Sequence, residues 1–131
     1  DIVAKPIIEY VPDLGQSRSP AFSFESQLVQ PYAFDNTLGF SSYKPAVSSS
    51  PFTVDSQLVT VQDDGNGNLM LVTFGTDVES VFKPSVGTLD YTTGAVKFSD
   101  LNVQSFTGSE IKFFANTQNK DIVPPKDRQT Y

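Results

Sequence analysis

The sequence of 131 residues contains no cysteine, no histidine and no tryptophan, and it has a single methionine. Without cysteine the chain forms no disulfide bonds and has no thiol nucleophile. Without histidine it also lacks the most common zinc ligand and the general base on which most hydrolases rely. No apolar run approaches the roughly 20 residues that a membrane helix needs. These absences remove disulfide-stapled, zinc-dependent and histidine-assisted hydrolytic proteins from consideration.

Positive charge is also scarce, with nine Lys and Arg against 15 Asp and Glu, for a net charge of -6. Clustered Lys and Arg bind nucleic acids and anionic membrane surfaces, so we expect neither as a partner. With 38% hydrophobic and 18% charged residues, the chain is able to bury a core, unlike a disordered acidic tail. Its length fits one domain. The sequence opens at Asp1 rather than at a methionine, and we expect a domain of a longer protein.

The residues present favour β-structure. Aromatic residues make up 12% of the chain, and aromatic and β-branched side chains suit a pleated, half-buried surface. No window of a dozen residues carries apolar residues at helical spacing without an intervening Pro or Gly. We therefore expect an all-β fold, either a small antiparallel β-sandwich or a partly open barrel, built from successive hairpins with an extended proline-rich N-terminal segment.

The chain changes character near residue 57. Residues 1–56 are rich in Pro and Ser and predict a loop-rich arm with short strands. Residues 57–118 alternate apolar and polar positions between turn signals and predict the hairpin core. Residues 119–131 contain Pro124 and Pro125 and predict an extended exit segment.

The first predicted hairpin joins strands 57–62 and 69–74. The turn between them contains residues that tolerate positive φ or cap backbone amides, namely Asp64, Gly65, Asn66 and Gly67. Residues 69–74 are apolar on both faces, which predicts a central position in the sheet.

A second hairpin is predicted between residues 88–91 and 96–99. Gly94 sits where a three-residue hairpin loop needs a left-handed residue, and Gly87 is the other glycine expected at a structural turn. A last strand is predicted at 111–115.

Three motifs of this half are more specific than hairpin formation requires. They read DDGNGN at 63–68, GTLDYTTG at 87–94 and NKDIVP at 119–124. In this order and at this spacing they resemble the C-terminal part of the baseplate wedge subunit of T4-like contractile-tailed phages. The resemblance covers roughly residues 57–129 of the sequence. The exit departs from the family pattern, because it reads Asp-Arg at 127–128 where Arg-Asn is usual.

The resemblance implies a structural role. Wedge subunits of this family join around the tail hub into a ring that holds the baseplate together and rearranges when the tail contracts. The implied partners are other baseplate subunits and copies of the same chain. The resemblance implies no catalytic residue, no cofactor and no small-molecule substrate, and it implies a location in the virion after assembly in the host cytoplasm.

An alternative function is compatible with the same predicted fold. A carbohydrate- or surface-binding module of an adhesin or secreted protein shares the sandwich architecture and the lack of cysteine. Aromatic side chains would then stack on sugar rings, although the absence of tryptophan, the largest aromatic, weakens this reading.

Two parts of the sequence are candidate interfaces. One is an apolar segment between two prolines, comprising Ile7, Ile8, Tyr10 and Val11. Such a segment adds a strand to a neighbour's sheet edge or packs on its own domain. The other is Phe114, which shares the predicted solvent face of its strand with Lys112 and so indicates a second packing surface.

The turn at 63–68 also raises the question of calcium, because hard cations prefer carboxylate and amide oxygens. Asp64, Asn66 and Asn68 suit the first three ligand positions of an EF-hand loop. The pattern then fails, since Leu69 occupies the sixth position in place of Gly and Gly75 the twelfth in place of Glu. We expect a plain hairpin turn and no metal.

The remaining catalytic candidates are carboxylates, because glycosidases act with two carboxyl groups held across a cleft. The candidates are Asp63, Asp64, Glu79 and Asp90. Three of them fall at predicted turns, where short acidic side chains cap backbone amides. Nothing in their spacing brings them together, and we expect no enzymatic activity.

Overall fold

The structure is a computed structural model that describes residues 6–118. This part of the chain is all-β, as predicted, and none of it forms a helix able to cross a membrane. The predicted exit segment, and with it the third motif of the resemblance, lies outside the described residues. The strands are β1 (Ile7–Tyr10), β2 (Ser17–Arg18), β3 (Ala21–Ser23), β4 (Val47–Ser49), β5 (Phe52–Val54), β6 (Gln57–Asp63), β7 (Asn68–Thr73), β8 (Val81–Asp90), β9 (Ala95–Phe98), β10 (Leu101–Asn102), β11 (Ser105–Phe106) and β12 (Ile111–Ala115).

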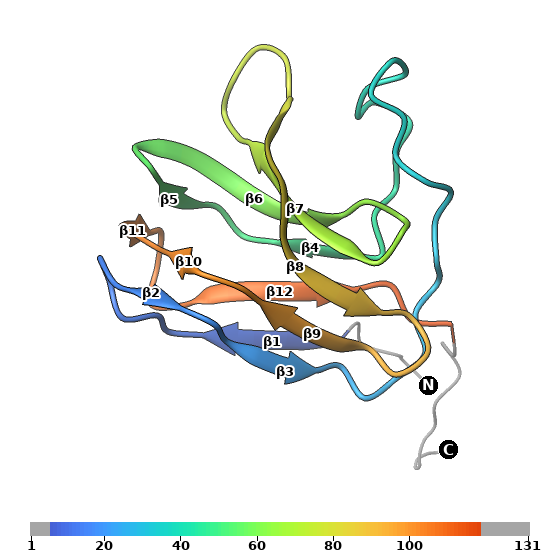
Figure 1. The fold of residues 1–131 in the computed structure, drawn as a ribbon, viewed down its shortest axis with the longest axis horizontal. Coiled ribbons are helices and arrows are strands. Elements are labelled where there is room, and N and C mark those ends of the chain that lie inside the picture. The colour runs from blue at the N-terminus through green and yellow to red at the C-terminus, as the bar shows by residue number, and fades with distance from the viewer. Residues whose placement is uncertain (1–5, 119–131) are drawn as a thin grey trace.

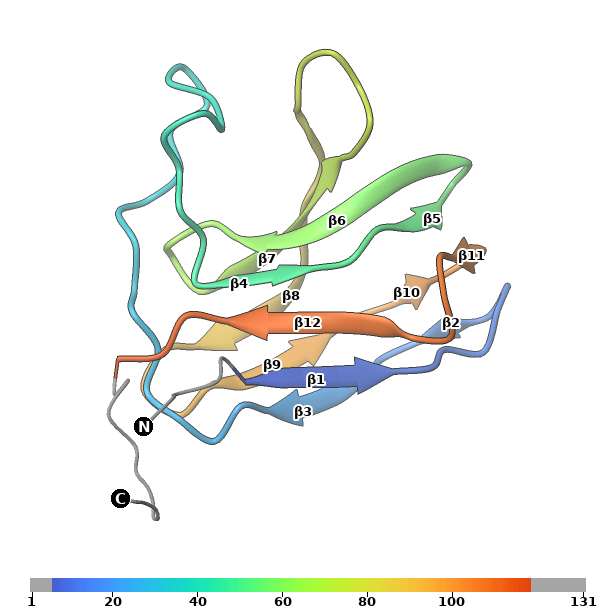
Figure 2. The ribbon, with the colours of Figure 1, turned by 180° about the vertical axis from the view of Figure 1, so that it is seen from behind.

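One antiparallel sheet forms most of the molecule and curls into a half-open barrel (Figure 1). Its strand order is β1-β12-β4-β6-β7-β8-β9-β3, and β5 pairs with both β6 and β11. A separate small sheet pairs β2 with β10. Seen from behind, β1, β12 and β4 run across the molecule below β6 (Figure 2). The fold class predicted from the sequence is confirmed.

The predicted hairpins form where the turn residues allow positive φ. Residues 57–63 and 68–73 pair as β6 and β7, and β7 lies between β6 and β8, which confirms its central position. A further hairpin, not predicted from the sequence, joins β5 to β6 through Asp55 and Ser56. These residues have φ of 49° and 66°, which matches the two-residue turn that suits the twist of paired strands.

Strand β8 links the upper and lower halves of the barrel (Figure 1). It pairs with β7 through an irregular register and then with β9. Gly87, predicted as a turn residue, lies inside this strand and does not have positive φ. A Cβ at this position would lie 2.2 Å from the Lys97 carbonyl oxygen and 3.0 Å from the Phe98 Cα. The glycine is therefore required by the close approach of β9.

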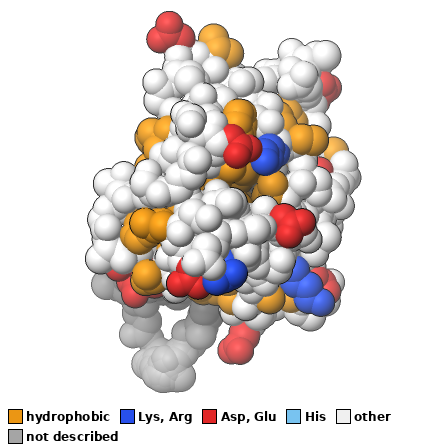
Figure 3. All heavy atoms as spheres, turned by 60° about the vertical axis from the view of Figure 1, so that its left-hand side comes forward, with side chains coloured by type: hydrophobic (Ala, Val, Ile, Leu, Met, Phe, Trp, Pro, Cys, Tyr) orange, Lys and Arg blue, Asp and Glu red, His pale blue; other side chains and the backbone are white. Residues whose placement is uncertain are grey.

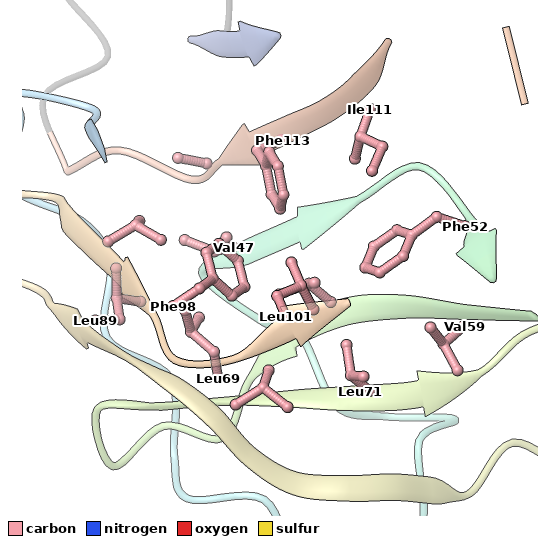
Figure 4. Close-up of a cluster of buried hydrophobic side chains, with 14 of the residues drawn as sticks. Val47, Phe52, Val59, Leu69, Leu71, Leu89, Phe98, Leu101, Ile111 and Phe113 are labelled. Atoms are coloured by element: carbon pink, nitrogen blue, oxygen red, sulfur yellow. The ribbon is translucent and has the colours of Figure 1, made fainter. Parts of the chain in front are cut away.

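The core fills the inside of the curled sheet. Its aromatic centre contains Phe113, whose ring lies 5.1 Å from that of Phe22 and 5.6 Å from that of Phe98. Side chains from both halves of the sheet point into this space (Figure 4), including Val47, Phe52, Val59, Leu69, Leu71, Leu89, Leu101 and Ile111. Such burial is the main favourable term in folding and fixes the strand register, because a one-residue slip would turn these side chains to solvent.

Candidate functional site

The predicted apolar segment is an edge strand of the domain's own sheet. Strand β1 pairs with β12, which places Ile7 opposite Phe114 and Ile8 opposite Phe113. Ile8 and Tyr10 face inward and pack against the core. The segment was expected either to add to a neighbour's sheet or to pack on its own domain. The second expectation therefore holds for Ile8 and Tyr10, which are half of its four apolar side chains.

The other side chains of this segment form an exposed strip along the sheet edge. Ile7 is 52% exposed on the outer face beside the half-buried Phe114. Val11 and Leu14 are also exposed beyond β1, at 67% and 52%, and the exposed acidic residues Glu9 and Asp13 lie between these apolar positions. We call the four apolar residues Ile7, Val11, Leu14 and Phe114 the edge strip. The five residues predicted as an interface thus lie on β1 and β12 or directly after β1. Three of them, Ile7, Val11 and Phe114, belong to the edge strip.

The turn at 63–68 is held by its own hydrogen bonds. The Asp64 carboxylate accepts from the backbone amides of Asn66 and Asn68 at 2.8 and 3.1 Å, and from the Asn68 side-chain amide at 3.0 Å. Gly65 and Gly67 have φ of 83° and 87°. Both carboxylate oxygens of Asp64 are used within the turn. Within residues 6–118 no three acidic side chains gather in a way that could hold a metal ion.

The hairpin between β8 and β9 differs from the prediction by one residue. The strands end at the pair formed by Asp90 and Ala95, so Tyr91 belongs to the turn rather than to the strand. Gly94 has φ of 78°, as the predicted left-handed position requires, and Asp90 accepts hydrogen bonds from the following backbone amides. From this turn position the Tyr91 hydroxyl donates to the Asp63 carboxylate.

Of the four candidate catalytic carboxylates, Asp63 alone is buried, with no exposed surface. Its oxygens accept from the Tyr91 hydroxyl at 2.5 Å and from the Val47 backbone amide at 2.9 Å. Asp64 and Asp90 cap turns, and Glu79 lies exposed in the loop between β7 and β8. The structure therefore distributes the four groups over turns and loops, and gives Asp63 a role in joining segments of the fold.

The surroundings of Asp63 shift the pKa values of three groups. Burial raises the pKa of the Asp63 carboxyl, and hydrogen bonds from Tyr91 and from the Val47 and Ala46 amides act in the opposite direction. Burial also raises the pKa of the Tyr91 hydroxyl, with a further increase from its bond to Asp63. The pKa of Tyr43, whose hydroxyl donates to the Asp63 backbone carbonyl, is raised by burial and then by the two neighbouring aspartates. Both tyrosines therefore remain hydrogen-bond donors at neutral pH.

A pocket not predicted from the sequence lies in the long loop between β3 and β4. The cavity has a volume of about 810 Å³, and its lining includes Gln30, Tyr32, Asp35, Leu38, Lys44 and Asn116. Tyr32 is 96% exposed and Leu38 is 70% exposed. One feature of the sequence could have indicated this pocket: residues 29–45 lack the alternating periodicity of a strand. Loops of this length without secondary structure are commonly functional in compact domains.

Charges of both signs are interspersed on the described surface. Arg18 pairs with Asp13 at 3.1 Å and Lys83 with Asp55 at 3.0 Å. The face toward β2, β5 and β11 shows basic side chains beside acidic ones among small apolar areas (Figure 3). Positive charge on this face is therefore paired rather than gathered into a patch.

Comparison with protein-family models, with curated proteins and with solved structures gave no match.

Proposed function

We propose that this domain is a structural assembly module of a contractile phage-tail baseplate, and that it acts through protein–protein contacts without catalysis and without a cofactor. The proposal starts from the resemblance of the turn at 63–68 and the hairpin at 87–94 to the wedge subunit family. It assigns the protein to the tail of the virion, where its partners are other baseplate subunits and copies of itself.

The edge strip is the observation that carries this proposal. An exposed sheet edge presents unpaired backbone groups, and proteins commonly protect such edges with charge, proline or a covering segment. Here one charged residue, Glu9, lies in the edge strand opposite Lys112, while Ile7 before it is 52% exposed and Val11 and Leu14 after it are exposed as well. Exposed apolar residues gathered in one place mark contact surfaces, whereas single ones are ordinary.

Light scattering over a wide concentration range tests this surface with a second copy as the partner. We expect the mass to rise above the 14.3 kDa of the monomer and to fall back in the variant Ile7→Lys/Val11→Lys, because two buried ammonium groups would oppose association. Val78→Lys is the matched control, since Val78 is 79% exposed in the loop between β7 and β8. A monomeric mass at every concentration would contradict self-association through the edge strip.

A further inference from the structure

The loop that carries the pocket is closed at its base. The Val29 amide donates to the Asn116 carbonyl at 2.9 Å, and the Asn116 amide donates to the Ala46 carbonyl at 2.7 Å. One residue after β12 therefore holds both ends of the segment 30–45. Compact loops with adjacent ends and their own internal packing are Ω-loops, which are frequently functional.

Aromatic side chains give this loop an interior of its own. The rings of Phe34 and Phe40 stack at 4.4 Å, and Tyr43 meets Phe34 edge-on at 5.2 Å. The Tyr43 hydroxyl anchors this group by donating to the Asp63 carbonyl. This aromatic centre and its anchor give the backbone of the loop a defined shape before any ligand arrives, which lowers the entropy cost of binding.

The turn at 63–68 supports the same loop from below. The Phe34 amide donates to the Asp64 carbonyl at 2.8 Å, and the Gln30 side chain donates to the Gly65 carbonyl at 2.9 Å. A Cβ on Gly65 would lie 2.7 Å from the Tyr32 carbonyl oxygen. The backbone of Tyr32 is thus held against the turn while its side chain remains 96% exposed.

The pocket beside Tyr32 combines an aromatic face with mixed polar groups. Asp35 supplies a carboxylate, one oxygen of which already accepts from the amide and the hydroxyl of Thr37. Lys44 supplies an ammonium, and Asn116 supplies an amide that both donates and accepts. The two charges are opposite, so the pocket favours neither an anion nor a cation. Its volume of about 810 Å³ lies in the range of small-molecule sites.

From this arrangement we propose that the pocket binds a neutral saccharide, one pyranose ring of which lies on the exposed ring of Tyr32. A sugar ring has an apolar C–H face that packs on an aromatic ring, and its hydroxyl groups both donate and accept hydrogen bonds. Those hydroxyls match Asp35, Lys44 and Asn116. A nucleotide or an acidic sugar fits less well, because Lys44 is balanced by Asp35 and the chain has a net charge of -6. This binding activity is separate from the assembly role and does not depend on it.

Ligand-observed NMR and calorimetric titration with maltotriose, cellotriose and chitotriose test the proposal. We expect at least one probe to bind, and Tyr32→Ala to weaken its binding by about fivefold or more because the stacking face is removed. Tyr32→Phe keeps the ring and is expected to stay within about twofold of the parent. Phe74→Ala removes an exposed aromatic outside the pocket and serves as the matched control.

Two results would overturn the saccharide site. One is the absence of binding for all three saccharides up to about 10 mM, because a dissociation constant above this concentration would be too weak for a specific site. The other is binding that Tyr32→Ala leaves unchanged, with far-UV circular dichroism showing that the variant is folded. The assembly proposal and the saccharide proposal can be tested independently. Tyr32→Ala is expected to leave the mass from light scattering unchanged, and Ile7→Lys/Val11→Lys is expected to leave saccharide binding unchanged.

Discussion

Replacing Asp63 tests the physical account of the fold most directly. Its carboxylate joins the end of β6 to the Val47 amide at the start of β4 and to the Tyr91 hydroxyl in the turn after β8. Asp63→Ala leaves at least the Val47 amide and the Tyr91 hydroxyl without this acceptor. A buried donor without a partner costs about 1–3 kcal/mol, so the two together cost about 2–6 kcal/mol. A domain of this kind is stable by about 5–15 kcal/mol, so we expect a large loss.

Asp63→Asn separates the hydrogen bonds from the charge. An asparagine oxygen accepts from the Val47 amide, and its amide group donates to the Tyr91 oxygen. Burial raises the pKa of the Asp63 carboxyl because it opposes the charge, and an asparagine carries no charge. We therefore expect Asp63→Asn to cost at most about 1 kcal/mol at neutral pH.

The same shift predicts a pH dependence with a defined sign. The unfolded carboxyl releases its proton near the ordinary value of 3.8, whereas the folded carboxyl keeps the proton to a higher pH. Between these two values the folded state binds more protons, so the free energy of unfolding falls as the pH rises. Asp63→Asn removes this part of the pH dependence, and the variant becomes relatively more stable as the pH rises through the window.

Urea unfolding followed by far-UV circular dichroism, at several pH values from about 4 to 7, measures these effects. Asp77→Asn, in the exposed loop between β7 and β8, is the matched control for the loss of one negative charge. The reasoning is wrong if Asp63→Ala unfolds within about 1 kcal/mol of the parent. It is also wrong if Asp63→Asn is as damaging as Asp63→Ala, since the charge itself would then be required.

Further predictions concern backbone geometry and core packing. Gly87→Ala is expected to lower the free energy of unfolding in urea by more than about 3 kcal/mol, because the added Cβ would clash with the backbone of β9. Gly108→Ala is the control: its Cβ would meet nothing within 4 Å, so it should cost only the φ strain of about 1–2 kcal/mol. Equal costs for the two variants would contradict the steric explanation. Ser56→Gly is expected to stabilise the β5–β6 turn by about 0.5 kcal/mol, since it removes the strain at φ 66°; a lower urea midpoint would count against this. Phe113→Ala is expected to lower the unfolding free energy by about 3–5 kcal/mol, and a loss under about 1 kcal/mol would show that the core collapses around the cavity.

The sequence predicted those parts of the fold that local chemistry determines. The glycines of the turn at 63–68 and Gly94 have the positive φ expected of them, and the apolar run at 69–74 forms a central strand. These features depend on residues close together in the chain. Gly87 was misassigned because its glycine requirement comes from β9, a constraint that composition does not reveal.

The candidate sites were harder to predict because long-range contacts create them. The apolar segment beginning at Ile7 is visible in the sequence, but its division into inward and outward side chains depends on pairing with β12. The burial of Asp63 depends on Tyr91 and Val47, which lie far away in the chain. The pocket beside Tyr32 needs Asn116 to close the Ω-loop.

The pairing of β1 with β12 has a mechanical consequence. The two strands are antiparallel, so Ile7 at the start of β1 lies beside Phe114 near the end of β12. A pulling force applied through the two ends of the domain therefore enters at one end of the strand pair and loads its hydrogen bonds one after another. Unzipping of this kind yields at low force, whereas shearing loads all the bonds at once. We therefore expect β1 and β12 to separate at low force when the domain is pulled between Ile7 and Ala115.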